Sequence, residues 1–161
     1  MGLNLYLRRI PTAADKQKMH SLIDAGRFDT LAEFLNTVNK TIHLGKFSAG
    51  WQFKFDTNDG IYYMPRRQEI INFCERNGYE VVGDKTPMSI TEAFEMIDTW
   101  NADPKNSITT KSYFDANPDQ FVSWLVNDKD LKRWSELGFN VNRYGTFINE
   151  GYEFDISSGW E

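Results

Sequence analysis

The sequence predicts a single α+β domain over residues 1–161, with helices packed on one side of an antiparallel or mixed sheet. Segments in which apolar and polar residues alternate, a pattern typical of half-buried strands, occur near both ends of the chain and around residues 42–63. Segments with the apolar spacing of helices fill the gaps between them. No linker separates the chain into parts, and a domain of this length buries enough surface to need no disulfide or metal.

The first 40 residues are expected to form a strand and two helices. Residues 3–7 alternate between leucine and polar residues, which predicts the opening strand. Thr12 is placed to cap a helix over residues 13–25. Thr30 and Glu33 match a capping box, which predicts that a second helix starts immediately after Thr30.

A hairpin is expected in the middle of the chain. If Leu44 pairs with Trp51, then Ile42 pairs with Phe53, and all four apolar side chains share one face of the sheet. This register leaves Gly45 to Gly50 as a loop, with glycines that allow positive φ angles.

The rest of the chain continues the alternation of helices and strands. The elements expected up to residue 110 are a strand at 61–63, a helix that opens with Pro65 and ends at 77–78, a strand over 79–82, a helix capped by Ser89 with Glu92, and a polar loop over 101–110. The elements expected after it are a helix that begins at Asn117-Pro118, a helix capped by Asp128, and strands at 147–148 and 152–156.

Composition excludes several classes of function. The formal net charge of -5 and the pI of about 5.1 oppose binding to nucleic acid or to an anionic membrane surface. Cys74 is the only cysteine, which excludes an intramolecular disulfide and a multi-cysteine zinc site. The start of the chain is too short and too soon charged for a secretory signal, and no run of about 18 apolar residues occurs. We therefore expect a cytoplasmic protein, with no cofactor and no membrane partner.

The expected central loop is the first candidate site. Gly45-Lys46 resembles the end of a phosphate-binding loop, but Lys40 stands where that motif requires glycine. A looser alternative is an anion-binding nest of backbone N–H groups, to which Lys46 and Ser48 add a charge and a hydroxyl. An ordinary solvated hairpin loop fits the same residues.

His43 is the second candidate, on the strand face that it is expected to share with Gln52 and Lys54. A histidine there can serve as a general base, but the expected neighbours include a cation and no carboxylate to orient the ring. With two histidines in the chain, no Ser-His-Asp or His-Cys spacing occurs. We therefore assign no catalytic residue, and a structural role for His43 remains the alternative.

Charged pairs and aromatic residues give further candidates. Arg66 and Arg67 lie in the first turn of a predicted helix, where the dipole disfavours cations. An anionic ligand or carboxylates such as those of the terminal strand would compensate them, and two solvated arginines are the alternative. Glu153 and Asp155 share one face of the last strand, which suits a metal or paired-carboxylate site and equally suits a solvated polar face. Aromatic residues expected at a partner-docking surface are Phe47, Trp51, Tyr62, Tyr63 and Trp160. The candidate ligand-binding set is His43, Lys46, Ser48, Trp51, Arg66 and Arg67.

Three segments carry a resemblance to a known family. They are Met1-Gly2-x-Asn4-x-Tyr6-Leu7, His43-x-Gly45-Lys46-x-Ser48-x-Gly50-Trp51-x-Phe53 and Glu150-Gly151-Tyr152-Glu153-Phe154. The pattern resembles a family of small, functionally uncharacterised proteins that bacteriophages and prophages encode. Members often carry a cysteine pair before the central motif, which this chain lacks. The resemblance implies a phage accessory protein in the cytoplasm of the bacterial host and carries over no catalytic residue. It also leads us to expect that the three segments pair in one sheet.

These observations favour a binding protein over an enzyme. The leading expectation is a phage accessory protein that engages or inhibits a host protein, such as a defence component, because the chain is rich in aromatic residues and lacks a catalytic motif. The second is a binder or hydrolase of a small anionic ligand such as a nucleotide. The third is a minor virion or assembly component. The oligomeric state stays open.

Overall fold

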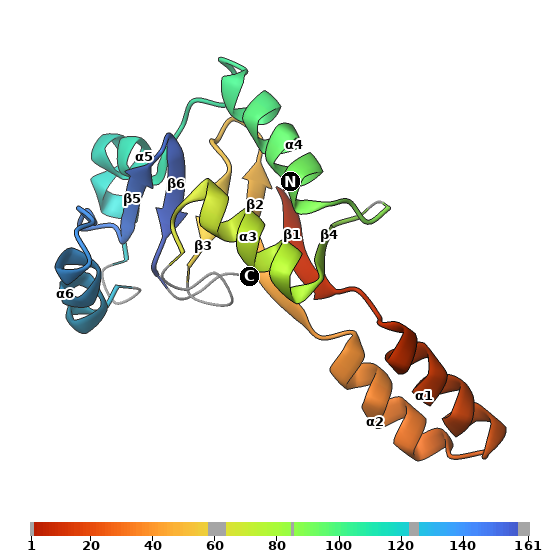
Figure 1. Cartoon of the computed structure of the whole chain (residues 1–161). Helices are drawn as coiled ribbons and strands as arrows, with labels where there is room; N and C mark the ends of the chain where they lie inside the picture. The colour runs from red at the N-terminus through yellow and green to blue at the C-terminus, as the bar shows by residue number, and fades with distance from the viewer. Residues whose placement is uncertain (1, 58–63, 85, 123–125, 158–161) are drawn as a thin grey trace.

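The computed structural model describes residues 2–57, 64–84, 86–122 and 126–157. Within these residues, six strands form one mixed sheet in the order β4-β1-β2-β3-β6-β5 (Figure 1). The strands are β1 (Gly2–Arg9), β2 (Thr41–Ser48), β3 (Lys54–Asp56), β4 (Tyr79–Val82), β5 (Thr146–Asn149) and β6 (Tyr152–Asp155). Neighbouring strands are antiparallel except β3 and β6, which are parallel. The first, central and last strands therefore lie in one sheet, as expected.

The described helices are α1 (Ala13–Asp24), α2 (Phe28–Val38), α3 (Arg67–Asn77), α4 (Ile90–Ala102), α5 (Thr110–Ala116) and α6 (Asp128–Glu136), with a 3-10 turn, η1 (Pro118–Gln120). Together with the mixed sheet they confirm the α+β class. None of these helices has the length and apolar character needed to cross a membrane.

The hydrophobic core lies between the sheet and the helices α3 and α4, which cover one face of it (Figure 1). The ring of Phe55, on the central strand β3, lies 5.0 Å from that of Phe154 on β6 and 5.7 Å from that of Phe94 on α4. Cys74 on α3 is buried in the same core. Aromatic rings therefore supply much of the packing, since each buries a large apolar area.

Local signals in the sequence located the starts of α1 and α4 and the end of α3. Thr12 and Ser89 cap α1 and α4 with capping boxes, and Gly78 ends α3 in the left-handed conformation. The expected start of α2 was wrong, because that helix begins at Phe28, before the Thr30–Glu33 box. Arg27, at the N-cap of α2, makes no side-chain capping hydrogen bond, so this start carries no capping signal.

Other boundaries also differ from expectation. α3 begins at Arg67 rather than Pro65, and Asn127 rather than Asp128 caps α6. The helix expected at Asn117-Pro118 is the 3-10 turn η1. α5, which Thr109 caps together with Ser112, was not expected. The strand expected at 61–63 lies outside the described residues.

The register expected for the central hairpin is wrong. Strand β2 continues through Gly45 to Ser48, so the loop expected to begin at Gly45 is absent from that position. Gly45 pairs with Phe55 on β3 instead. Trp51 lies in the connection after β2, half-buried, with its ring 5.0 Å from that of Tyr113. Leu44 and Phe53 are buried, as expected.

A bulge at Leu44 interrupts the pairing of β2 with β1. Leu5 pairs with Gly45 and Tyr6 pairs with His43, so Leu44 is an extra residue that shifts the alternation by one. Gly45 then faces the core, and the ring of Phe53 occupies the space that a Cβ at position 45 would take. The sequence does not show the bulge, because it depends on contacts between three strands.

Helices α1 and α2 form an antiparallel pair between β1 and β2 that projects away from the sheet (Figure 1). We call this pair the helical arm. α1 has no buried residue, and in α2 only Val38 is buried. The Nζ atom of Lys18 on α1 lies 4.6 Å from the ring centroid of Phe34 on α2, and such contacts join the two helices. The arm therefore contributes little to the core.

Candidate functional site: the polar face of the sheet

The face of the sheet opposite α3 and α4 carries a row of polar side chains, which we call the polar face. Strand pairing places Lys54 beside Lys46 on one side and beside Glu153 on the other. It also places Asp56 beside Asp155. Because side chains alternate along each strand, these polar side chains lie on the face opposite the buried apolar residues. The polar face consists of Asn4, His43, Lys46, Lys54, Asp56, Glu153 and Asp155.

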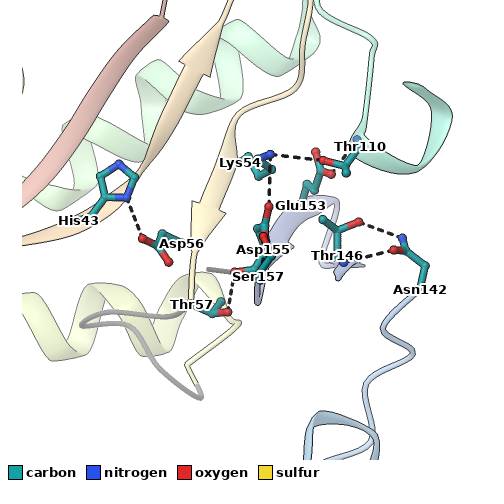
Figure 2. A network of polar contacts seen from close by, with 10 residues as sticks. All are labelled: His43, Lys54, Asp56, Thr57, Thr110, Asn142, Thr146, Glu153, Asp155 and Ser157. Carbon is teal, nitrogen blue, oxygen red and sulfur yellow. Dashed lines mark hydrogen bonds and ion pairs between the residues drawn. The ribbon is translucent and has the colours of Figure 1, made fainter. Parts of the chain in front are cut away.

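His43 is held by two partners on this face. Its Nδ1 atom lies 2.8 Å from Oδ2 of Asp56 (Figure 2). Its Nε2 atom lies 2.9 Å from Oδ1 of Asn4. Both oxygens are acceptors in this arrangement, so a protonated ring donates to both, whereas a neutral ring needs a reversed Asn4 amide. The expectation that no carboxylate orients His43 was wrong, because β2 and β3 are neighbours in the sheet.

Lys54 and Asp155 form a second group on the polar face. The Nζ atom of Lys54 lies 3.2 Å from Oδ2 of Asp155 and 3.5 Å from Oγ1 of Thr110 (Figure 2). The N–H of Ser157 donates to Oδ1 of the same aspartate at 2.7 Å. Burial raises the pKa of Asp155, and the positive charge of Lys54 opposes this shift.

Glu153 is the most deeply buried carboxylate of the polar face, with 2% of its surface exposed. Its Oε2 atom accepts a hydrogen bond from the N–H of Thr110 at 2.9 Å, and its Oε1 atom has no hydrogen-bond partner among the described residues. Burial raises its pKa, while the Thr110 N–H and the charge of Lys54 oppose the shift. The alternative of a solvated polar face for Glu153 and Asp155 was therefore wrong, because the start of α5 lies against Glu153.

The candidates Lys46 and Ser48 lie on a strand and not in a loop. Lys46 and Ser48 belong to β2, so the expected anion-binding loop from Gly45 to Gly50 is not formed. Lys46 shares the polar face with His43. Trp51 contacts α5 instead. Of the proposed docking aromatics, Phe47 is buried, while Tyr62, Tyr63 and Trp160 lie outside the described residues.

Carboxylates lie beside both arginine side chains, as one of the expected alternatives had it, but they come from α3 and α4 and not from the terminal strand. Arg66 lies 3.1 Å from Oε1 of Glu69, and the Arg67 guanidinium contacts Asp98 at 2.5 Å. The contact with Asp98 raises the pKa of Arg67. Glu150, in the turn before β6, accepts from the N–H of Arg67 at 2.9 Å. Because α3 lies on the opposite side of the sheet, the structure does not bring these arginines together with His43.

Asp56, the carboxylate partner of His43, was missed in the sequence, although one signal was present. Lys54 and Asp56 alternate with Phe53 and Phe55, which already indicates that they share a face. Their partners on β6 are about 100 residues away, with 98 positions between Thr57 and Asp155, which are joined by a hydrogen bond. Only the parallel pairing of β3 with β6 brings them together.

Chemically, the polar face is a network of contacts between its own side chains more than an open reaction site. A general base needs a ring nitrogen within reach of a substrate, and both nitrogens of His43 contact protein oxygens. Among the described residues, no group of three or more histidine, cysteine, aspartate or glutamate side chains is placed to hold a metal ion. Comparisons of this chain with protein-family models, curated proteins and solved structures found no match.

Proposed function

We propose that this protein acts by binding another protein, and that the tip of the helical arm is its contact surface. The observation that supports this most directly is the exposure of two large apolar residues at that tip. Phe28 is 64% exposed and Ile23 is 48% exposed, where the two helices of the arm meet. An exposed aromatic side chain on a projecting element is a typical anchor of protein interfaces.

The helical arm contributes little to the stability of the sheet and its core. Helices of 12 and 11 residues are marginally stable alone, and this pair is packed mainly against itself. Polar side chains flank the apolar tip in sequence, namely Asp24, Arg27 and Asp29. An apolar centre with a polar rim is the usual organisation of a binding surface. The partner proposed is therefore a protein with an apolar cavity that receives the ring of Phe28.

The resemblance to phage-encoded proteins supports a partner from the bacterial host, such as a defence component. The protein would then act as a phage accessory factor, by engaging or inhibiting that partner. The geometry of His43 is consistent with a non-catalytic role, since its ring nitrogens are engaged by Asp56 and Asn4.

A photoreactive phenylalanine analogue tests this proposal. It is placed at position 28 and, as a matched control, at Ile148, which is 58% exposed on β5. In a bacterial lysate, irradiation is expected to attach one discrete protein at position 28 and none at position 148. Unlabelled wild-type protein should compete for that partner, whereas the Phe28→Ala variant should not. Equal labelling from both positions, or no labelling from position 28 across several hosts, contradicts the proposal.

A second candidate function is the binding or hydrolysis of a small anionic ligand such as a nucleotide. The observation that favours it is the placement of Lys46 on the same face as the His43–Asp56 pair, since Lys46 forms no ion pair with a described residue. A thermal-shift screen with nucleotides and inorganic phosphate tests it. A ligand at 100 times its dissociation constant should stabilise the protein by about 2.7 kcal/mol, and the Lys46→Met variant should lose this effect. No shift with any anion rules it out.

A further inference from the structure

An open groove runs along α4, on a part of the molecule separate from the helical arm. Its floor is apolar and is formed by Met88, Met96 and Trp100. Its rim is acidic and is formed by Glu92, Glu95 and Asp103. Within α4, positions 92, 96 and 100 recur at helical spacing, and Met88 and Asp103 flank the two ends of the helix, so the groove follows one side of α4 along its length.

The floor of the groove is well supported from below. The indole N–H of Trp100 donates to the backbone oxygen of Trp51 at 2.7 Å, and the ring lies 5.1 Å from that of Phe47. Met88 and Met96 are partly buried against the core, and the flexible methionine side chain adapts to ligands of different shape. The groove therefore has a fixed aromatic end beside two adaptable residues.

The rim carries negative charge that the chain itself does not neutralise. Glu92 accepts from the N–H of Ser89 as part of the α4 cap, and Asp103 accepts from the N–H of Lys105 at 3.0 Å. Neither residue, nor Glu95, forms an ion pair with a described residue. Three uncompensated carboxylates beside exposed apolar surface complement a ligand that is both basic and amphipathic.

We infer that this groove binds a basic amphipathic helix of another protein, with apolar residues on the Met96–Trp100 floor and lysines or arginines against the acidic rim. The 13 residues of α4 span about 20 Å, which matches a helix of three to four turns. Docking of an amphipathic helix into an apolar groove is a common form of peptide recognition. This inference rests on the proposed function, because it takes the partner to be a protein. It adds a second contact surface, the groove, and it specifies the bound segment as a basic amphipathic helix.

Titration with a synthetic peptide tests the inference on the full chain. The probe is a peptide of leucine and lysine of about 14 residues, with leucines spaced three and four positions apart. A peptide with glutamate in place of each lysine is the charge control. The lysine peptide is expected to bind with an affinity that falls as salt rises, and to shift the nuclear magnetic resonance signals of Thr99 and the Trp100 indole.

Two rim variants and one control variant locate the binding site. Glu95→Gln and Asp103→Asn are each expected to weaken binding by roughly two- to fivefold, as for exposed ion pairs. Glu75→Gln changes the net charge equally on the exposed side of α3, outside the groove, and should leave the affinity unchanged. Equal weakening by all three variants, resonance shifts confined to other elements, or the absence of saturable binding overturns the inference.

The outcomes also separate this inference from the proposed function. The Phe28→Ala variant should bind the peptide as tightly as the wild type, because the arm lies away from the groove (Figure 1). Loss of photolabelling at position 28 with intact peptide binding therefore contradicts only the role of the arm. Intact photolabelling with no peptide binding contradicts only the groove.

Discussion

The Nδ1 atom of His43 on β2 lies 2.8 Å from the Oδ2 atom of Asp56 on β3. Because Asn4 on β1 contacts the other ring nitrogen, a single imidazole joins three neighbouring strands on the polar face. The side chains of His43 and Asp56 are 13% and 5% exposed, so water competes weakly for this contact. The pair therefore belongs to the structural core of the sheet, and its removal has a measurable cost.

Replacement of Asp56 tests that cost. Asp56→Ala removes the carboxylate that holds His43 and should lower the free energy of unfolding by about 2 to 3 kcal/mol in urea titrations. Asp84→Ala, on an exposed residue after β4, is the control and should change it by less than about 0.5 kcal/mol. In a double-mutant cycle with His43→Ala, the two losses should not add. Additive losses would contradict a direct His43–Asp56 interaction.

The burial of Glu153 predicts a pH effect of defined sign. Because burial raises its pKa, the folded state binds this proton more tightly than the unfolded state. Its contribution to stability is therefore greatest in acid, below about pH 4, and is lost as the pH rises through the folded-state pKa. The glutamine of the Glu153→Gln variant cannot ionise. The free energy of unfolding of this variant, minus that of the wild type, should therefore rise from acid to neutral pH.

Urea titrations across this pH range measure the difference. The exposed Glu75→Gln variant serves as the control and should follow the wild-type profile. If the free energies of unfolding of the wild type and of Glu153→Gln changed in parallel with pH, burial would not raise the pKa of Glu153, and the prediction would be wrong.

Gly45 is expected to tolerate no side chain. A Cβ at this position would collide with the backbone oxygen of Lys54 and would lie 2.6 Å from Cζ of Phe53. Gly45→Ala should therefore destabilise the protein by about 1 to 3 kcal/mol. At Gly83 the nearest atom is Cδ2 of Leu5, at 3.2 Å, so Gly83→Ala should cost less. Equal effects in thermal unfolding would argue for the loop that the sequence first predicted around position 45.

The helical arm should be removable. Arg8 on β1 pairs with Thr41 on β2, so Asn-Gly in place of residues 11–40 leaves a four-residue connection, residues 9 and 10 followed by Asn-Gly, between the two strands. The free energy of unfolding should fall by only about 2 kcal/mol, because Val38 is the one buried residue of the two helices. Nuclear magnetic resonance signals of the sheet should keep their positions. Global unfolding of the shortened chain would show that the arm is part of the core.

Short-range patterns located most elements of this fold. Alternating leucines predicted β1, and the capping residues Thr12 and Ser89 placed the starts of α1 and α4. These signals act within a few residues, through side chains that bond to nearby backbone groups or that alternate across a strand. The expectation that the first, central and last strands share a sheet came instead from the three segments that resemble phage-encoded proteins, and these strands do lie in one sheet.

The sequence by itself determined the α+β class and most of the order of strands and helices, because periodicity and capping are local properties of the chain. Only the tertiary structure decided the β2–β3 register, the contact of His43 with Asp56, and the burial of Glu153. The register depends on a bulge at Leu44 and on the ring of Phe53 filling the space beside Gly45. The burial of Glu153 depends on parallel pairing of β3 with β6 and on Thr110 lying against it. Such contacts between distant segments leave no pattern in the neighbouring residues.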